Sequence, residues 1–399
     1  MFYRLLLITG FAATVGLKPG IDMESSFHRG DSLITFFMCG DVMLGRGIDQ
    51  ILPHPGDPVL HESYVKNARR YVDIAERKNG AIPRDAGYSY VWGDALQIVD
   101  GEGPDLRMIN LETSITESDD YMKRKGIHYR MHPDNVPCLT AAGIDLCALG
   151  NNHVMDWGYD GLVETLEVLD SAGIRYAGAG LDVGEAEQPA IFHTGGGGRG
   201  LVVSCGATNS GVPGRWAAGE DYPGLFLLND FSDRSVSRIK DCVENAGDDD
   251  VVIVSIHWGS NWGYSIPSDH VEFAHRLIDE AGVDIIHGHS SHHVKGIEVY
   301  RGRLILYGCG DFLNDYEGIS GHEKYRGDLS LMYFVSVNAS TGELAGLKMV
   351  PTQTRKFRVS RATGRDAEWL YHTLDRECEK LGTCVVRSGE GHLVLDWNR

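Results

Sequence analysis

Carboxylate, amide and imidazole side chains recur along this chain directly after short apolar runs. Five such places carry them: Asp41; Asn110 and Glu112; Asn151, Asn152 and His153; His257; and His287, His289, His292 and His293. A carboxylate neutralises charge, an amide oxygen adds a weak ligand and neutral imidazole donates nitrogen, so the set suits a divalent metal ion. Each residue taken singly fits a turn, a helix cap or a buried histidine. Their conjunction after five apolar runs favours a metal site.

The elements that must position these groups follow from hydrophobic periodicity. Short apolar β-rich runs alternate with amphipathic stretches, which predicts a layered α/β architecture. Strands are expected at 34–39, 106–111, 146–149, 201–205, 251–257, 285–288 and 304–307. Open α/β sheets bind their ligands beyond the carboxyl ends of the strands, where these polar groups stand.

The pattern changes after residue 326. Two long alternating strands are expected at 329–337 and 343–352, followed by a helix at 365–381 and a terminal hairpin. We expect three parts: a loosely ordered leader at 1–32, the main domain at 33–325, and a tail at 326–399 that completes the fold. The glycine run at 195–198 indicates a hairpin or loop tip, because no lysine-bearing helix follows it to make a phosphate cradle.

Composition excludes several partners. The chain has 399 residues, 42% of them hydrophobic and 23% charged, as in ordinary globular proteins. Its formal net charge of −19 argues against nucleic acid and anionic membranes. An anionic small-molecule or polymer substrate would need a local basic patch or a metal ion.

The amino-terminus and the cysteines bear on the compartment. The apolar segment at 5–15 is too short to span a bilayer, so no transmembrane span is expected, although a weak export signal is an alternative. Four of the eight cysteines, Cys39, Cys147, Cys205 and Cys309, lie in or beside apolar strand runs and none forms a CxxC pair. We therefore expect reduced core cysteines and favour the cytoplasm, with Cys378 and Cys384 the pair most open to oxidation.

Several segments match the motifs of a known family in the same order. They are Gly40-Asp41 with Met43-Leu44-Gly45-Arg46, Asn110-Leu111-Glu112-Thr113, Gly150-Asn151-Asn152-His153 with Asp156 and Gly158, His257-Trp258-Gly259, and Gly288-His289-Ser290-Ser291-His292. From about residue 36 to 316 the chain resembles the CapA (PGA_cap) capsule-synthesis proteins, a branch of the calcineurin-like metallophosphoesterases.

The resemblance implies a four-layer α/β/β/α sandwich with a small carboxyl-terminal α+β extension. It also implies metal ligands, namely Asp41, Glu112, Asn152, His257 and His289, for one or two ions of Mn, Fe, Zn or Mg. His153 corresponds to a general acid, and His292 to a ligand or transition-state partner. Met43 stands where the wider superfamily has a histidine, and Asn110-Leu111-Glu112 replaces its Gly-Asp, so one of the two metal positions is weakened and a single tightly held ion is an alternative to two.

Substrate contacts are expected from Arg46 and Arg130, beside motif residues, and from Trp258. Lys123 to Lys125 fit a solvated charge run better. The segment at 310–315 either orients the histidines or forms a turn. The favoured function is hydrolysis of a phosphoester, or of an amide in a glutamate-type polymer, linked by resemblance to poly-γ-glutamate capsule synthesis. Metal-assisted proton transfer in a peptide epimerase and a non-catalytic role in capsule assembly stay open, as does the oligomeric state.

Overall fold

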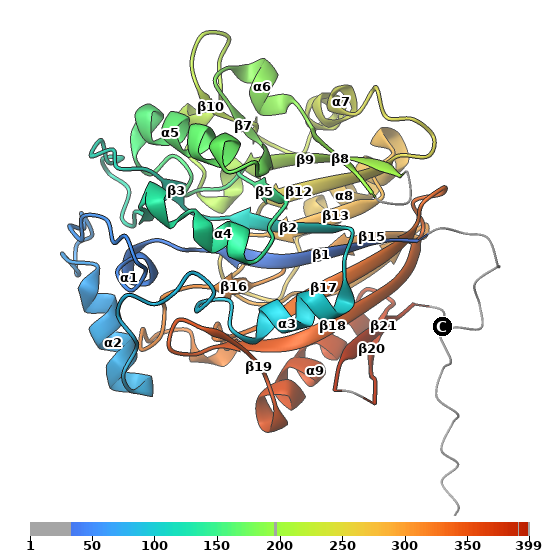
Figure 1. Ribbon diagram of the computed structural model, residues 1–399. Helices are drawn as coiled ribbons and strands as arrows, with labels where there is room; N and C mark the ends of the chain where they lie inside the picture. The colour runs from blue at the N-terminus through green and yellow to red at the C-terminus, as the bar shows by residue number, and fades with distance from the viewer. Residues whose placement is uncertain (1–32, 195–197, 390, 398–399) are drawn as a thin grey trace, which may run out of the picture. The chain divides into compact units, whose positions relative to one another are not determined.

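The computed structural model describes residues 33–194, 198–389 and 391–397 (Figure 1). The expected leader at 1–32 and residues 195–197 of the glycine run lie outside the described residues. The described residues all fall within one unit.

A ten-stranded sheet contains the first predicted strand and most of the tail. Its strand order is β20 (Cys384–Arg387), β21 (Leu393–Asp396), β18 (Leu344–Thr354), β17 (Leu329–Asn338), β1 (Leu33–Val42), β2 (Leu106–Leu111), β5 (Leu146–Ala148) and β6 (Arg175–Ala177), with β16 (Asp311–Leu313) beside β1 and β19 (Val359–Arg361) beside β18. β1, β2, β5 and β6 are parallel, whereas β17, β18, β21 and β20 pair antiparallel. The strands after residue 326 therefore extend the sheet that contains β1.

A seven-stranded sheet contains the histidine-bearing strands. Its order is β11 (Leu227–Leu228), β9 (Arg199–Ala207), β12 (Val251–His257), β13 (Ile285–His289), β15 (Arg303–Leu306) and β14 (Ile297–Tyr300), with β8 (Ala190–His193) beside β9. Its central strands are parallel, so their carboxyl ends share one edge. Two small sheets pair β7 (Ala179–Gly180) with β10 (Gly224–Leu225) and β3 (Ser114–Ile115) with β4 (Arg130–Met131). Every strand predicted from the sequence is confirmed.

Alternation along the strands divides the core. In β1, Phe37 belongs to a cluster of buried apolar residues between the ten-stranded sheet and its helices, whereas Phe36 and Met38 belong to a second such cluster. The second cluster also holds Val202 and Ile253 of the seven-stranded sheet, so the two sheets share one apolar core. This follows from side chains pointing to opposite faces of a strand in turn.

Helices cover the remaining faces (Figure 1). They are α1 (Arg46–Asp49), α2 (Arg69–Asn79), α3 (Asp94–Glu102), α4 (Pro137–Ala141), α5 (Gly158–Ser171), α6 (Val183–Glu187), α7 (Asp233–Cys242), α8 (Ser268–Ala281) and α9 (Gly364–Glu379). α3, α4 and α5 contribute to the Phe37 cluster, and α7 and α8 to a third cluster on the seven-stranded sheet. α9, expected at 365–381, packs into the core between the sheets through Leu370 and Leu374. The architecture is thus mixed α/β, as expected.

Two further expectations concern the whole chain. None of the helices in the described residues is long and apolar enough to cross a membrane. All eight cysteines are free, including Cys378 and Cys384, and all but Cys242 are buried.

Candidate active site

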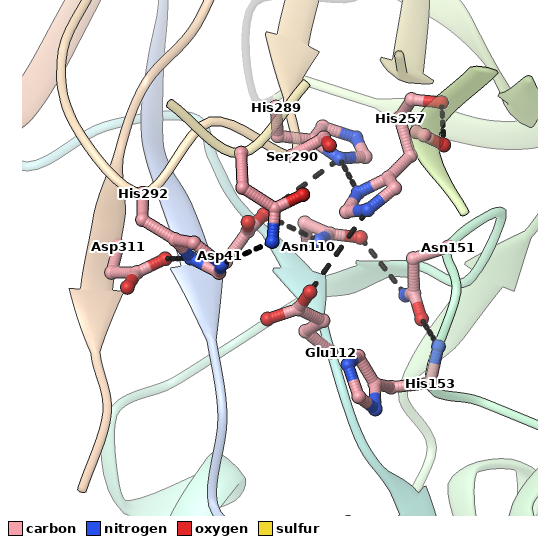
Figure 2. Close-up of polar contacts among 12 residues, drawn as sticks. Asp41, Asn110, Glu112, Asn151, His153, His257, His289, Ser290, His292 and Asp311 are labelled. Carbon is pink, nitrogen blue, oxygen red and sulfur yellow. Dashed lines mark hydrogen bonds and ion pairs between the residues drawn. The ribbon is translucent and has the colours of Figure 1, made fainter. Parts of the chain in front are cut away.

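The carboxyl ends of strands from both sheets meet at one place (Figure 2). Asp41 lies near the end of β1, and its Oδ1 is 3.7 Å from Nδ1 of His289, the last residue of β13. His287 on β13 also lies across from β1, with its Nε2 2.8 Å from the carbonyl oxygen of Cys39. The site is therefore formed jointly by the two sheets.

A first group of candidate ligands contains three of the predicted residues. Asp41, His257 and His289 are buried and each offers a ligand atom within 4.8 Å of the others. Glu112 lies beside them, with Oε1 3.9 Å from His257 Nε2. Ligands of one ion stand about 2.0–2.6 Å from it, so donor atoms this close can share a centre. The structure thus brings these four predicted residues together.

Asn152, the fifth predicted ligand, has a side-chain oxygen without a partner. Its Oδ1 is buried and has no hydrogen-bond partner, a property that the Oδ2 of Asp41 shares. Buried polar oxygens are rarely left without partners, and each such case calls for an explanation. Two unpartnered oxygens on predicted ligands fit the donor set of a cation site.

A second group contains Asp311, which the sequence named only within the segment 310–315 that orients the histidines or forms a turn, and not as a ligand. Asp41, His292 and Asp311 offer ligand atoms within 4.8 Å of one another. Asp311 begins β16, which runs parallel to β1 with Asp41 opposite Asp311. The close approach depends on glycine, because a Cβ on Gly40 would lie 1.7 Å from the carbonyl oxygen of Gly310. The tripeptide Cys-Gly-Asp occurs at both 39–41 and 309–311, and this repeat could have revealed Asp311.

Charge in the site is unbalanced. Burial, and then the neighbouring Asp311 carboxylate, raise the pKa of Asp41 to about 8. Burial followed by the charges of Asp41 and Asp311 also raises the pKa of Glu112 well above its usual value. Burial, and the proximity of His257, lower the pKa of His289 well below its ordinary value. Clustered carboxylates with neutral imidazoles attract a divalent cation.

Neighbouring groups fix the orientation of the ligands. The Oγ of Ser255 lies 3.0 Å from His289 Nε2 and 3.0 Å from His287 Nδ1. Asn110 donates from Nδ2 to Asp41 Oδ1 at 2.7 Å and accepts from Nδ2 of Asn151 at 3.1 Å. Such supporting contacts hold metal-binding side chains in place. Asn110 therefore orients Asp41, and Asn151 in turn orients Asn110.

His153, the predicted general acid, is paired through one ring nitrogen. Its Nδ1 lies 2.6 Å from Asp156 Oδ2 and 3.0 Å from Nζ of Lys125. Its ring stacks on Tyr129, with 3.8 Å between the ring centroids. Burial, and then the charges of Lys125 and Arg46, lower the pKa of His153 well below its ordinary value. An imidazole held through Nδ1 keeps Nε2 for another partner.

Lys125 corrects an expectation from the sequence. The run 123–125 was expected to be solvated, but Nζ of Lys125 donates to Asp156 Oδ1 at 2.5 Å and its side chain is only 15% exposed. Lys123 and Arg124 are exposed. A charge run gives no sign of which member turns inward, because the partner carboxylate lies 31 residues away along the chain.

The expected substrate contacts have other partners in the structure. Arg46 is buried in ion pairs with Glu62 and Asp315. Arg130 stacks on an indole and donates to the carbonyl oxygen of Ser118 at 2.7 Å. Trp258 lies in the core against α8 and donates from Nε1 to a carbonyl oxygen at 3.0 Å. All three side chains therefore have partners within the protein, and of the three only Arg46 is among the residues that line the large cavity adjoining the site.

A cavity of about 670 Å³ adjoins the site. His292 lines it together with Arg46, Tyr129, Trp262 and Tyr316. Lys78, Arg326 and Arg355 line it as well, together with the carboxylates of Glu317, Glu323, Asp328 and Asp366, so its wall carries charges of both signs. This is the kind of concave, mixed surface that binds small ligands. Trp262 lines this cavity, whereas Trp258, which was expected to contact the substrate, does not.

Comparison with known proteins agrees with the motif order. The family model "Bacterial capsule synthesis protein PGA_cap" matches residues 35–316. A probable polyglutamine synthesis accessory protein of Mycobacterium tuberculosis is 48% identical over 356 residues, covering 89% of this chain and 93% of that protein. The capsule biosynthesis protein CapA of Bacillus anthracis is 26% identical, covering 88% of this chain and 75% of its own length. PGA biosynthesis protein CapA of Bacillus subtilis is 25% identical, over 78% and 70% respectively. With its motifs in order and the match extending over most of its length, the chain belongs to the PGA_cap family.

Proposed function

We propose that this chain is a metal-dependent hydrolase with the α/β/β/α sandwich of the calcineurin-like metallophosphoesterases. The observation that supports this most is the pair of ligand groups sharing Asp41, beside a histidine held by a carboxylate. A non-catalytic assembly component has no use for a positioned acid. A fold alone does not choose a reaction, so the proposal depends on these side chains.

Two ion positions fit the donors. The first would use Asp41, His257, His289 and Glu112, with Asn152 as an amide ligand. The second would use Asp41, His292 and Asp311, so that a carboxylate substitutes for the imidazole lost at Met43. The unpartnered oxygens of Asp41 and Asn152 support this assignment. When bound, such ions supply Lewis acidity that polarises the scissile group and activates water.

His153 would donate the proton to the leaving group from its imidazolium form, which burial and the charge of Lys125 disfavour in the protein without substrate. Asp156 fixes its ring through Nδ1, and Lys125 neutralises that carboxylate. Residues positioned this way contribute about 10²–10⁴-fold in rate. His153 is not a ligand in this scheme, so its loss should leave ion binding intact.

The substrate is proposed to be anionic. Lys78 and Arg355 line the cavity beside Glu317 and Glu323, and the described residues offer the side chain of neither cation an ion pair within 4.0 Å, so both stay able to contact an anionic group. Arg46 carries a charge already balanced by Glu62 and Asp315, so its part would be to hold the wall rather than to supply net charge. The relatives are named for polyglutamine and capsule synthesis. A phosphoester, or an amide bond within a glutamate-type polymer, is the substrate class we assign.

The test combines ion analysis with two matched variants. Purified protein is assayed for bound metal and screened on aryl phosphates and glutamyl peptides. His153→Ala should keep its ions but turn over slowly, with some loss of thermal stability because the ring packs on Tyr129 and bonds Asp156, whereas His289→Ala should lose ions. Full activity of His153→Ala on a substrate with a poor leaving group would remove His153 as the acid and make His292 the next candidate. Deuterium uptake from solvent without bond cleavage would support the epimerase alternative instead.

A further inference from the structure

Two tyrosines meet above the candidate site. The hydroxyls of Tyr129 and Tyr316, 187 residues apart along the chain, are hydrogen-bonded to each other. Tyr129 is buried, Tyr316 is half-buried, and both line the cavity of about 670 Å³ that His292 also lines. Neither residue was assigned a role from the sequence.

The first tyrosine is tied to the His153 side of the site. Its ring stacks on the imidazole of His153 with 3.8 Å between centroids. Its backbone N–H donates to Asp156 Oδ2 at 2.7 Å, the same oxygen that holds His153 Nδ1. The position of the Tyr129 ring is therefore set by the group that orients the proposed acid.

The second tyrosine is tied to the His292 side. Its ring meets His292 edge to face, with 5.5 Å between centroids. Its backbone N–H donates to Asn314 Oδ1 at 3.0 Å, and Asn314 donates from Nδ2 to Asp311 Oδ2 at 2.9 Å. Asp311 in turn binds His292 Nδ1 through Oδ1 at 2.8 Å. The hydroxyl pair thus joins the two halves of the site.

One hydroxyl proton of the tyrosine pair has no acceptor in the part of the chain that the structure describes. A phenol has a pKa near 10 and carries one proton at neutral pH, so two phenols hold two protons. One proton forms the bond between the hydroxyls, and the accepting hydroxyl still has its own. The described residues offer no further bond to either oxygen, and Arg46 lies over the Tyr129 ring at 4.8 Å. The remaining O–H can donate to a ligand in the cavity.

We infer that the Tyr129–Tyr316 pair is an oxyanion-binding donor, which hydrogen-bonds a non-bridging oxygen of a tetrahedral oxyanion, or of the reacting group of the substrate. The pair would bind charge that grows as the reaction proceeds, as oxyanion-stabilising donors do. The inference rests on the proposed function for its catalytic part. Its binding part stands without turnover.

The experiment uses the full chain loaded with Mn²⁺ and three variants: Tyr129→Phe, Tyr316→Phe and the double variant. Phenylalanine keeps the ring packing, so melting temperature and metal content should match the parent. Tyr176→Phe is the matched control, because its hydroxyl bonds Asp170 at 3.2 Å outside the cavity. Binding of orthophosphate is measured by calorimetry, and hydrolysis of an aryl phosphate by steady-state kinetics.

The double variant should bind phosphate about 10- to 100-fold more weakly, as expected for a lost bond to a charged group, and kcat should fall by a similar factor. Each single variant keeps one hydroxyl whose proton is free for the ligand, so it should lose less affinity than the double variant. Metal-loaded variants with parental phosphate affinity and parental kcat would overturn the inference while leaving the hydrolase proposal standing. A parent that binds phosphate through the pair without turning over any substrate would support the inference and count against the hydrolase. A parent that binds neither ion nor phosphate would overturn both.

Discussion

Replacement of Asp41 by asparagine should stabilise the protein after its divalent ions are removed. The pKa of Asp41 is about 8 in the folded chain, against 3.8 for the ordinary side chain. A carboxyl with a raised folded pKa contributes stability below pH 3.8 and loses it as pH rises toward 8, because the folded state holds the proton more tightly. Asparagine resembles the protonated acid and can still accept from Asn110.

The magnitude follows from the same two values. One pKa unit corresponds to 1.36 kcal/mol, so ionisation of Asp41 in the unfolded chain lowers the free energy of unfolding by about 1 kcal/mol at pH 4.5 and about 4 kcal/mol at pH 7, relative to its value below pH 3.8. The stability of Asp41→Asn minus that of the parent should therefore grow by about 3 kcal/mol between these pH values. Removing this candidate ligand should thus raise the free energy of unfolding of the metal-free protein.

The assay is urea unfolding in chelator at pH 4.5, 5.5 and 7. Asp170→Asn removes the same charge from an exposed position on α5 and should show no such trend. Adding Mn²⁺ at about 100 times its dissociation constant should stabilise the parent by about 2.7 kcal/mol and leave Asp41→Asn unaffected. An Asp41→Asn protein that is less stable than the parent in chelator at pH 7 would refute the reasoning, since ionised Asp41 would then be favourably paired.

Three other predictions test separate parts of the structure. His270 accepts from Asn209 at 3.0 Å, and burial lowers its pKa to about 4. The unfolded chain therefore takes up its proton first, so stability should fall by about 2 kcal/mol as pH drops from 7 to 5. Urea unfolding of His270→Gln should lack that component, and an unchanged slope would contradict it. Lys125→Met should lower the free energy of unfolding by about 3–5 kcal/mol, measured by thermal or urea unfolding, because it leaves buried Asp156 without its cation. Exposed Lys123→Met is the control and should change stability by about 0.5 kcal/mol or less. Equal effects of the two substitutions would argue against the buried pair. Thiol titration without reductant should find all eight cysteines free in denaturant and almost none reactive in the native protein; a largely oxidised count would place the protein in an oxidising compartment.

Much of the fold was predictable because its signals are local. The strands predicted at 106–111 and 251–257 coincide with β2 (Leu106–Leu111) and β12 (Val251–His257) to the residue. Short apolar β-rich runs bounded by polar groups specify such buried strands without reference to distant parts of the chain. The same local pattern placed Asp41, Glu112 and His257 at strand ends.

Tertiary contacts decided which of those ends meet. Asp311 joins Asp41 only because β16 crosses to lie beside β1, where Gly40 and Gly310 permit the approach. The pairing joins segments about 270 residues apart, and hydrophobic periodicity carries no information about it. The tripeptide Cys-Gly-Asp occurs at both places, but only the pairing of β1 with β16 shows that the two copies lie side by side.

Side-chain roles also depended on distant partners. Arg46 lies in a motif and Lys125 in a charge run, yet both are paired inside the protein, Arg46 with Glu62 and Asp315 and Lys125 with Asp156. Sequence by itself determined the strands, the donor types and the family, since these depend on residue identity and short-range spacing. The pairing of charges, the second ligand group and the tyrosine pair were decided only by the fold, because each needs two segments that approach one another through sheet pairing and not along the chain.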